Sequence, residues 1–537
     1  MKIVLIVWAA AALAMLCCGL FDLLKIFSSV KWLKREKEPY IPSHEDQPFI
    51  IILLPVLREQ RLITETLNVF AKLKYPLHQL RVFVITTEKE LAQQEKAKKR
   101  LILLAKDIAS KRLATALLIE KYLGIFSEDI LKKEIAIACD MENELEVYAY
   151  LLKIFGAYPT TIDLVREDVA TLNERAGISL FTHLHYPYVE GNMGQQLEYA
   201  IKQLPLYLAD QNIPKSHAYL AVYNADSRPH IETLQYVANL CSNYQTQDKS
   251  SPPVIQQSAI FLENTSNFGL DLKSLLLQSA AILQTRFVLS HELPRLQQQS
   301  RSALQFQQGN LKLHQRLFGA EFALCVGHGL FIRYDIADRL NIFSLSDNSD
   351  DLLWSFLLCI EHIPILPLPL LESAESPTTV KSLIVQKKNW FLGYTEYFHS
   401  RTIALQERRF KRSVVEFVTF HGLMRAIKWL FLSPTVFLAF ALPILMASWQ
   451  LLLIAFVIFA IYGFLTFSVI LKELQTLKGR SGGVWSPFSF SMLRKICLVL
   501  FSLPAFLIES LGLWWCVLQY FRCAFTGIPV QKQKTER

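Results

Sequence analysis

Long apolar runs near both ends of the chain enclose a central part in which polar and apolar residues alternate on a shorter scale. Residues 3–27 form the first run, and residues 427–446, 449–471 and 496–521 form three more near the C-terminus. Each run has the length, roughly twenty residues, that an α-helix needs to cross the hydrocarbon core of a bilayer. The pattern predicts a membrane protein whose polar domain lies between the first run and the second.

The central part begins with a strand, a helix and a second strand. Residues 49–55 are apolar and end at Pro55, residues 62–73 have apolar side chains at helical spacing, and residues 80–88 form an apolar run that ends in polar residues. This order predicts a parallel sheet with a ligand crevice at the carboxyl ends of its strands. Residues 219–222 predict a further buried strand, residues 90–118 a helix, and residues 125–180 mixed helix and loop. The expected fold class is α/β with added transmembrane helices.

The first apolar run is expected to be a retained anchor, although a signal peptide is the competing interpretation. The run is long for a signal peptide, only Lys2 precedes it, and a basic cluster at residues 31–37 follows it. Basic residues mark the cytoplasmic side of a span, so the N-terminus would lie outside and the next domain in the cytoplasm. We therefore expect a multi-pass protein of the cell's inner (plasma) membrane.

The expected boundaries are a transmembrane anchor at 1–30, a soluble domain at 45–400, an amphipathic interfacial segment at 401–426, and membrane helices with a short basic tail at 427–537. Four complete spans would place the basic tail outside, against the usual charge distribution. One segment is therefore expected to be interfacial or re-entrant, and the candidate is 427–446, which contains Pro434 and Pro443. Glu509 is an acid within the last run and hence a functional suspect, unless it lies near a re-entrant bend.

The composition agrees with a soluble domain flanked by membrane spans and argues against some classes of function. Of the 537 residues, 52% are hydrophobic and 19% are charged, which is too apolar for an ordinary soluble protein. The net charge is +9, but many basic residues flank apolar runs and are not interleaved with aromatic residues on a polar domain, which argues against nucleic-acid binding. The nine cysteines are scattered and form no C-x-x-C pair, so buried reduced thiols are expected.

The strand at 219–222 leads into the most informative polar stretch, Tyr-Asn-Ala-Asp-Ser-Arg-Pro-His at residues 223–230. An acid at the end of a strand is well placed to hold a divalent cation against a diphosphate. Asp226 is therefore the metal candidate, with Asn224 beside it, and the expected cation is Mg²⁺ or Mn²⁺. An Asx-type turn before Pro229 is the alternative explanation of the same residues.

Four residues are candidates for contacts to a nucleotide. Pro55 and Glu59 lie in the turn after the first strand, Glu88 ends the second strand, and Asn192 lies in a glycine-containing turn that opens a helix. A carboxylate at a strand end can accept hydrogen bonds from a base or ribose, and the amides at a helix start favour a diphosphate. Solvated loop acids and a plain helix entry are the alternatives, and they are at least as good for each residue alone.

Two further motifs are candidates for the acceptor side of a reaction. Gly327 and His328 lie in a glycine-flanked turn before an apolar strand, where the backbone can approach a ligand closely. Asp350 and Asp351 open an apolar helix, and one of these carboxylates could remove the proton from an acceptor hydroxyl. Acids at a helix N-terminus also cap it and complement its dipole, which is the structural alternative.

A third motif lies at residues 386–390, Gln-Lys-Lys-Asn-Trp. Trp390 offers a flat apolar face for a sugar ring, and Gln386 offers amide hydrogen bonds. An amphipathic helix at the membrane surface is the alternative explanation, and the aromatic and basic stretch that follows suits an interface in either case.

In order and spacing, these motifs resemble those of the family-2 membrane glycosyltransferases, the group that includes cellulose, hyaluronan and chitin synthases. The resemblance covers about residues 49 to 400 and implies a GT-A fold, which has a Rossmann-like, mostly parallel sheet. The family's D-x-D metal motif corresponds to residues 224–226, its E-D motif to 350–351 and its Q-x-x-R-W motif to 386–390. The resemblance makes Asp351 the base and Glu88 the nucleotide-binding acid of the second strand.

Three positions depart from the family's motifs. Asn224 replaces the first acid of the metal motif, Asp350 replaces the glutamate of E-D, and Asn389 replaces the arginine of Q-x-x-R-W. The first departure weakens metal affinity or leaves it to the second acid of the motif. The last puts in doubt a contact to phosphate or acceptor, for which Lys387 or Lys388 could substitute.

The resemblance implies an inverting glycosyltransferase that moves a sugar from a nucleotide-diphosphate donor, expected to be uridine-linked, to a lipid-linked or growing glycan acceptor. The expected partners are this donor, this acceptor, the membrane and possibly the proteins of a glycan assembly system, and no nucleic acid. The alternative is a catalytically degenerate relative that serves as a scaffold in such a system. A transporter is a poor third hypothesis because the central domain dominates the chain.

Overall fold

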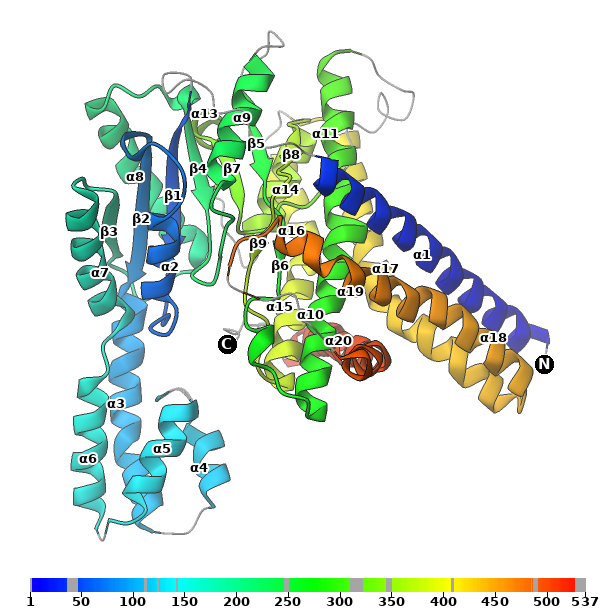
Figure 1. Ribbon diagram of the computed structural model, residues 1–537, viewed down its shortest axis with the longest axis horizontal. Coiled ribbons are helices and arrows are strands. Elements are labelled where there is room, and N and C mark those ends of the chain that lie inside the picture. The colour runs from blue at the N-terminus through cyan, green and yellow to red at the C-terminus, as the bar shows by residue number, and fades with distance from the viewer. Residues whose placement is uncertain are drawn as a thin grey trace. The chain divides into compact units, whose positions relative to one another are not determined.

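The computed structural model divides the chain into two compact units (Figure 1). Unit 1 comprises Met1–Ile52, Lys72–Leu80 and Pro205–Arg537, and unit 2 comprises Leu53–Ala71 and Arg81–Leu204. The structure describes residues 2–35, 47–110, 114–122, 125–126, 128–141, 143–245, 251–309, 322–343, 350–406, 410–483, 485 and 491–526. Residues 36–46, which include Lys37 of the basic cluster, and the basic tail at 527–537 lie outside the described residues.

The main sheet has seven strands in the order β3-β2-β1-β4-β7-β5-β8, and a second sheet pairs β6 with β9. β2 and β3 are parallel, as are β5 and β8, whereas β7 runs antiparallel to β4 and β5. This confirms the expected α/β class with a mostly parallel sheet. The strands are β1 (Phe49–Pro55), β2 (Leu80–Thr87), β3 (Phe181–Tyr186), β4 (Ala218–Val222), β5 (Val254–Gln256), β6 (Ala259–Ile260), β7 (Leu330–Arg333), β8 (Ile365–Pro367) and β9 (Glu372–Ser373).

Unit 2 is mostly helical around β2 and β3. Leu101, Leu131 and Leu151 are fully buried in a core that α3, α5 and α6 share, and α3 packs along α6. The helix expected at 62–73 is confirmed as α2. The helix expected at 90–118 is confirmed only as far as Ala109, where α3 ends, and the region 125–180 is largely helical. The helices of this part of the chain are α2 (Ile63–Ala71), α3 (Glu88–Ala109), α4 (Thr115–Tyr122), α5 (Glu128–Ala138), α6 (Glu144–Ala157), α7 (Thr161–Ala176) and α8 (Met193–Asp210), the last of which crosses the unit boundary.

Unit 1 contains β4, β7, β5 and β8 together with the helices that follow them. Every residue of β4 and β7 is buried, as expected for strands with a covered sheet on both faces. The helices are α9 (Thr233–Gln245), α10 (Leu272–Phe287), a π-helical turn η5 (Val288–Glu292), α11 (Leu293–Gln307), α13 (Tyr334–Leu340), α14 (Asp350–Ile360), α15 (Val380–Thr395) and α16 (Tyr397–Gln406), with short 3₁₀ turns η2 (Leu77–Gln79), η3 (Lys215–His217) and η4 (Thr265–Asn267).

Four helices of unit 1 are long and apolar enough to cross a membrane: Lys2–Arg35, Arg412–Leu445, Trp449–Lys478 and Met492–Cys523. The first is α1 and the second is α17. The third consists of α18 (Trp449–Phe459), a π-helical turn η6 (Ala460–Leu465) and α19 (Thr466–Lys478), and the fourth lies in α20 (Met492–Thr526). The helix α1 contacts α17, α18 and α19.

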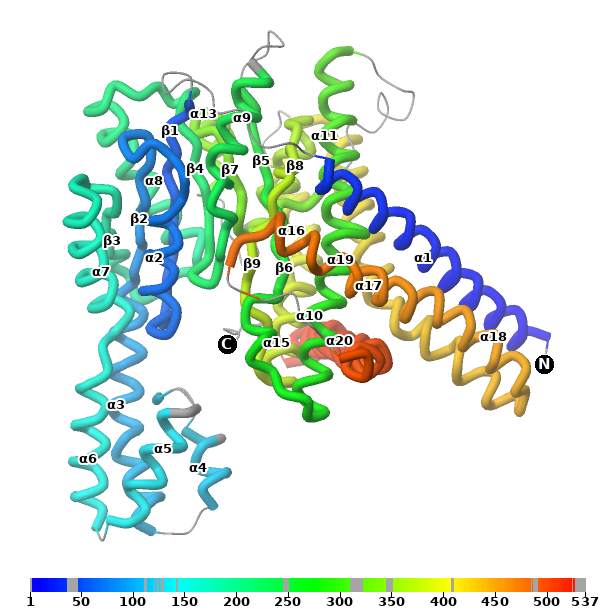
Figure 2. The backbone as a smooth tube through the Cα atoms, viewed as in Figure 1, coloured from blue at the N-terminus to red at the C-terminus, as the bar shows by residue number. Residues whose placement is uncertain are grey.

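The helix α20 runs in a different direction from the other three candidate spans. Figure 2 shows α20 nearly end-on, whereas α1, α17 and α18 run across the same view. Its main contacts are with α10 and α15, two helices of the sheet-bearing part of unit 1. The acceptor motif of α15 therefore packs directly on a candidate span.

The expectation that prolines break the segment 427–446 is wrong. The helix α17 runs without interruption from Arg412 to Leu445, with Pro434 and Pro443 inside it. Neighbouring helices can compensate the hydrogen bonds that a proline removes from a membrane helix, and Pro443 lies close to the helix end, where few such bonds are at stake. The same helix also contains much of the stretch 401–426 that was expected to be a separate interfacial segment.

Candidate active site

The turn after β4 holds Asn224 and Asp226 in a compact, buried conformation. The Asn224 N–H donates to Ser227 Oγ over 3.1 Å, and the Ser227 N–H donates back to the Asn224 carbonyl over 3.1 Å. The Arg228 guanidinium donates to the carbonyls of Ala225 and Ser227 over 3.2 and 3.1 Å. Asp226 is only 2% exposed. These bonds form a backbone turn closed by the Ser227 hydroxyl, and whether Asp226 serves as a ligand or only as part of an Asx-type turn stays a prediction.

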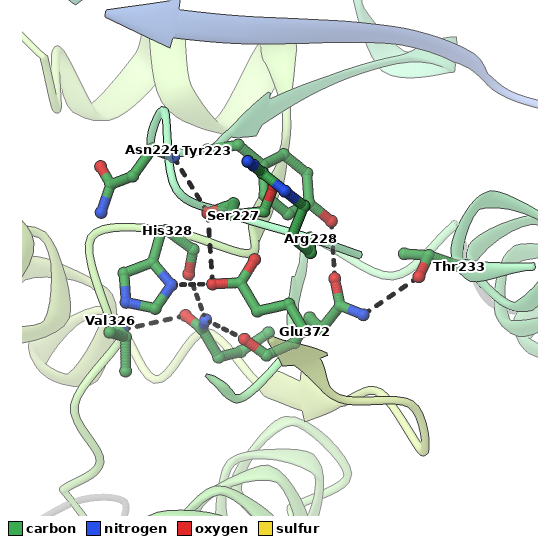
Figure 3. Close-up of polar contacts among 10 residues, drawn as sticks. Tyr223, Asn224, Ser227, Arg228, Thr233, Val326, His328 and Glu372 are labelled. Carbon is green, nitrogen blue, oxygen red and sulfur yellow. Dashed lines mark hydrogen bonds and ion pairs between the residues drawn. The ribbon is translucent and has the colours of Figure 1, made fainter. Parts of the chain in front are cut away.

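A buried histidine–carboxylate pair lies beside this turn. Figure 3 shows His328 Nδ1 directed at the Glu372 carboxylate, with Ser227 Oγ donating to the same oxygen over 3.5 Å. Glu372 is fully buried and His328 is 8% exposed. Burial lowers the pKa of His328, but the negative charge of Glu372 more than offsets this, so the net pKa is raised. The pair therefore holds a proton in the interior at the end of β4.

Two glutamines at the end of β5 fix the turn that carries His328. Gln256 Nε2 donates to the His328 carbonyl over 2.9 Å, and Gln256 Oε1 accepts from the Val326 N–H over 3.1 Å. The Gln257 N–H donates to the Gly329 carbonyl over 2.7 Å. Gly329 has φ +63°, and a Cβ there would come within 2.5 Å of the Gln257 carbonyl oxygen. Only glycine fits this close approach of two backbones, which explains the glycine in the predicted turn.

The structure brings Asp351 to the same turn. A Cβ on Gly327 would lie 3.4 Å from Asp351 Cβ and 3.5 Å from its carboxylate, which is ordinary contact distance. Asp351 lies in the first turn of α14, where its Oδ1 accepts from the Leu352 N–H over 3.0 Å. Ser355 Oγ donates to the Asp351 carbonyl over 2.7 Å. Asp350 begins α14, but its side chain and residues 344–349 before it lie outside the described residues.

The acceptor motif reaches this region through one aromatic residue. The Trp390 ring lies 5.6 Å from the ring of Phe261, which in turn lies 6.3 Å from the imidazole of His328, edge to face. Gln386 is buried one turn before Trp390 on α15 and lines a small pocket together with Phe261 and Lys387. Unit 1 thus gathers the turn of Asp226, the turn of Gly327 and His328, Asp351 and Trp390.

The two lysines that could replace the missing arginine both contact α20. Lys387 Nζ donates to Gln284 Oε1 over 2.7 Å and forms an ion pair of 3.1 Å with Glu509. Lys388 Nζ lies 5.2 Å from the centre of the Trp515 ring. Burial lowers the pKa of both lysines. Their contacts connect the motif to a candidate membrane span, and nothing in these contacts supports a substitution for the arginine of the family's motif.

The four candidate nucleotide contacts belong to unit 2. Pro55 ends β1, and the Glu59 N–H donates to Thr161 Oγ1 over 2.8 Å. Glu88 is the first residue of α3 and forms an ion pair of 3.0 Å with His185 of β3. The Asn192 N–H donates to Gln195 Oε1, and the Gln195 N–H donates to Asn192 Oδ1, both over 3.1 Å. Asn192 thus caps the start of α8, and its role towards a nucleotide stays a prediction.

Sequence reasoning missed two buried acids. Glu372 is the partner of His328. Glu90 accepts hydrogen bonds from the N–H groups of Arg58 and Thr161 over 3.2 and 2.8 Å, and these bonds hold the loop that contains Glu59 in place. Both are fully buried. For Glu372 a signal existed, because it is the single acid in the apolar, proline-rich run 363–374. An acid in such a run is expected to be paired or functional.

A metal would have to be bound jointly with a substrate. Among the residues that the structure describes, no group of three or more His, Cys, Asp or Glu could hold a metal ion by itself. Mg²⁺ bound with a nucleotide commonly takes only one or two carboxylates from the protein and its other ligands from phosphates and water. The single carboxylate of Asp226 at the end of β4 fits that donor set.

Comparison with known proteins adds little that is specific. No protein-family model matches the chain, and no curated protein sequence matches it. Among solved structures, the mannosyltransferase PcManGT from Pyrobaculum calidifontis, in complex with GDP-Man and Mn²⁺, is similar with a TM-score of 0.40 and 12% identity over 96% of this chain and 99% of that chain. TarS 1–349 from S. aureus is similar with a TM-score of 0.31 and 11% identity over 88% and 91%. Similarities at this level do not assign a family or an activity.

Proposed function

We propose that the chain is an inverting membrane glycosyltransferase that uses a nucleotide-diphosphate sugar, with a lipid-linked or growing glycan as acceptor. The observation that carries this proposal is the gathering of four separate motifs in unit 1. Gly327 contacts Asp351, His328 contacts Glu372 beside the turn of Asp226, and Phe261 bridges His328 to Trp390. Of these residues, the family resemblance assigns Asp226 to the metal, Asp351 to the base and Trp390 to the acceptor, and the three come from distant parts of the chain.

The reaction follows from the roles of these side chains. Asp351 accepts the proton of an acceptor hydroxyl while that oxygen attacks the anomeric carbon of the donor sugar. The new carbon–oxygen bond forms as the bond to the diphosphate breaks, and the nucleotide diphosphate leaves with the bonding electrons. Trp390 and Gln386 hold the acceptor sugar in line for this attack. A Mg²⁺ or Mn²⁺ ion held by Asp226 would offset the charge that develops on the diphosphate.

The remaining assignments are part of the same proposal. Pro55, Glu59, Glu88 and Asn192 contact the nucleotide, which we expect to be uridine diphosphate. Lys31, Lys34 and Arg35 at the end of α1 favour a cytoplasmic position for the domain that follows and attachment to the inner (plasma) membrane.

Replacement of Asp351 by Asn tests the function. Purified full-length protein with Mn²⁺ and a panel of uridine- and guanosine-linked sugars should release nucleotide, and Asp351→Asn should lower this release by about 10²- to 10⁴-fold, because the general base is lost. Glu361→Gln is the matched control, since Glu361 follows the last residue of the same helix and pairs with Arg339 at the surface. Equal release by Asp351→Asn and the wild type would refute the assignment of the base.

A catalytically degenerate scaffold is the second candidate. Asn224 and Asn389 replace an acid and an arginine of the family's motifs, and Lys387 and Lys388 contact α20. A scaffold would bind nucleotide but release none from any donor in the panel. Calorimetric titration with UDP and GDP, beside the release assay, separates this outcome from a protein that binds no nucleotide at all.

A further inference from the structure

A cluster of hydrogen-bond donors with unmet capacity lies where α15, α16 and α17 meet. Tyr397 is fully buried, and its hydroxyl has no hydrogen-bond partner among the described residues. Arg425 Nη2 donates to the Phe322 carbonyl over 2.6 Å, but its Nη1 is buried and likewise has no partner in the described part of the chain. Buried donors without partners are costly in a folded protein, so two of them together point to a polar ligand.

The two donors lie next to each other. A Cβ on Gly422 would come within 2.4 Å of Tyr397 Cζ, the carbon that bears the hydroxyl. Gly422 precedes Arg425 by three residues on α17, and residues at this spacing share one face of a helix. Both side chains also contact Phe322, whose ring lies 4.8 Å from the Arg425 guanidinium and 5.9 Å from the Tyr397 ring.

A second arginine faces the same place from α11. Arg295 lies within electrostatic range of Arg425, Tyr394 and Tyr397. Burial lowers the pKa of Arg295 to about 10, and the positive charge of Arg425 contributes to this. Two partly buried guanidinium groups that repel each other are stabilised by an anion between them, and a phosphate suits the planar fork of arginine.

The surroundings carry an excess of positive charge. Lys25 of α1 and Lys428 of α17 lie in electrostatic range of each other and of His291, which in turn lies in range of Arg295. One acid of this neighbourhood, Asp22, already forms a 2.8 Å ion pair with Arg286. A second acid, Glu292, has its pKa raised to about 7, mainly by burial, so it is only partly ionised at neutral pH. A group with more than one negative charge would be attracted here.

The cluster lies beside both the membrane helices and the proposed base. Arg425 belongs to a candidate span, and charged residues at such positions mark functional sites by default. Tyr394, which lies in range of both arginines, is also in electrostatic range of Asp351. If the arginines hold one end of a ligand, the group attached to that end lies on the side of the cluster that faces Asp351.

We propose that Arg295, Arg425 and Tyr397 bind the phosphate of a phosphate-bearing lipid acceptor. This inference rests on the proposed function and gives its acceptor a chemical class. The lipid chain would run along α1 and α17, and the phosphate would lie between the two guanidinium groups with the Tyr397 hydroxyl donating to one of its oxygens. The diphosphate of the donor has the same chemistry, but the position of Arg425 within a candidate span favours the lipid as its source.

Binding of a short lipid phosphate tests the site without any need for turnover. Full-length protein in detergent is titrated with farnesyl phosphate, with farnesol, which lacks the phosphate, and with UDP and GDP. Farnesyl phosphate should bind at least about tenfold more weakly to Arg295→Gln and to Arg425→Gln than to the wild type, because each loses charged hydrogen bonds. Farnesol, UDP and GDP should bind all variants equally.

Two further variants separate a binding role from a structural one. Tyr397→Phe removes only a buried hydroxyl that has no partner among the residues the structure describes, so the melting temperature should match or exceed that of the wild type while the affinity for farnesyl phosphate falls several-fold. Arg301→Gln replaces an exposed arginine on the same helix as Arg295. It should change neither the melting temperature nor the affinity for farnesyl phosphate.

Two outcomes overturn the lipid assignment, and two more distinguish failure of this site from failure of the proposed function. Weaker UDP or GDP binding in the arginine variants, with or without loss of farnesyl phosphate, would assign the pair to the donor. Unchanged affinities throughout would make the arginines structural. If farnesyl phosphate binding depends on the arginines but no donor sugar is ever turned over, the site stands and the proposed function fails. The reverse result leaves the function and removes this site.

Discussion

Two of the buried ion pairs of unit 1 look alike but serve different parts of the molecule. His328 and Glu372 lie beside the turn of Asp226, at the end of β4, whereas Lys387 and Glu509 join α15 to α20. The ordinary pKa of an imidazole is about 6.5 and that of a lysine ammonium is about 10.4. Glu372 raises the pKa of the histidine, whereas burial lowers the pKa of the lysine. The comparison indicates that the first pair can adjust its charge during a reaction, while the second acts as a fixed connection between the acceptor motif and a membrane helix.

The largest effect on stability is expected from Glu509→Gln. This change leaves the ammonium of Lys387 buried without a counter-charge, which typically costs about 3–5 kcal/mol. Denaturant unfolding of the purified protein in detergent measures the loss. Glu473→Gln is the control, because Glu473 pairs over 2.8 Å with Lys34, whose side chain is half exposed, and such pairs contribute about 0–1 kcal/mol. Similar losses of unfolding free energy in both variants would show that the Lys387–Glu509 pair stabilises the protein no more than an exposed pair does.

A smaller and pH-dependent effect is expected from Glu372→Gln. Because Glu372 raises the pKa of His328 above its ordinary 6.5, the pair stabilises the fold fully below pH 6.5, and this contribution is lost as the pH rises through the raised pKa. The variant should therefore lose about 1–3 kcal/mol below pH 6.5 and less at higher pH, where His328 is neutral in either protein. Melting temperatures between pH 5.5 and 9 measure this.

The control for the pH effect is His399→Gln, which removes an exposed histidine on α16. This variant should keep the pH profile of the wild type, whereas the profile of Glu372→Gln should be flatter. If Glu372→Gln instead lost the same amount of stability at every pH, the proton on His328 would have no part in the pair, and the contrast with Lys387 and Glu509 would disappear.

The local signals of the sequence account for the elements but not for the two pairs. The strand at 49–55 agrees with β1 to the residue, because a continuous apolar run ends at a proline that cannot extend the ladder. The turn of Asp226 and the start of α14 at Asp350 follow in the same way from local patterns. The prolines of α17 misled the interpretation, because the helix continues through Pro434 and Pro443, and membrane helices tolerate prolines that would end a helix in water.

The two ion pairs could not be predicted from the sequence because each joins residues that are far apart in the chain. Glu372 is a single acid in an apolar run, and nothing near it in sequence names His328 as its partner. The connection of Lys387 to Glu509 depends on the direction of α20, which hydropathy alone does not specify. A sequence read without homologues indicates that a buried acid needs a partner, but only the fold identifies that partner.

The smallest effect on stability, and the sharpest test of the comparison, is expected from the double variant Lys387→Met with Glu509→Leu. Replacing both members of a buried ion pair by apolar residues of similar volume is often neutral or stabilising, so the double variant should unfold within about 1 kcal/mol of the wild type although Glu509→Gln does not. Lys387 Nζ also lies 4.4 Å from the centre of the Trp390 ring, a contact that the methionine does not reproduce as a charge. If the Lys387–Glu509 pair positions Trp390 for the acceptor, the double variant should keep its donor KM and raise its acceptor KM several-fold. A stable double variant with unchanged acceptor kinetics would show that Lys387 and Glu509 have only a structural role. His328 and Glu372 would then be the ion pair that contributes to the reaction.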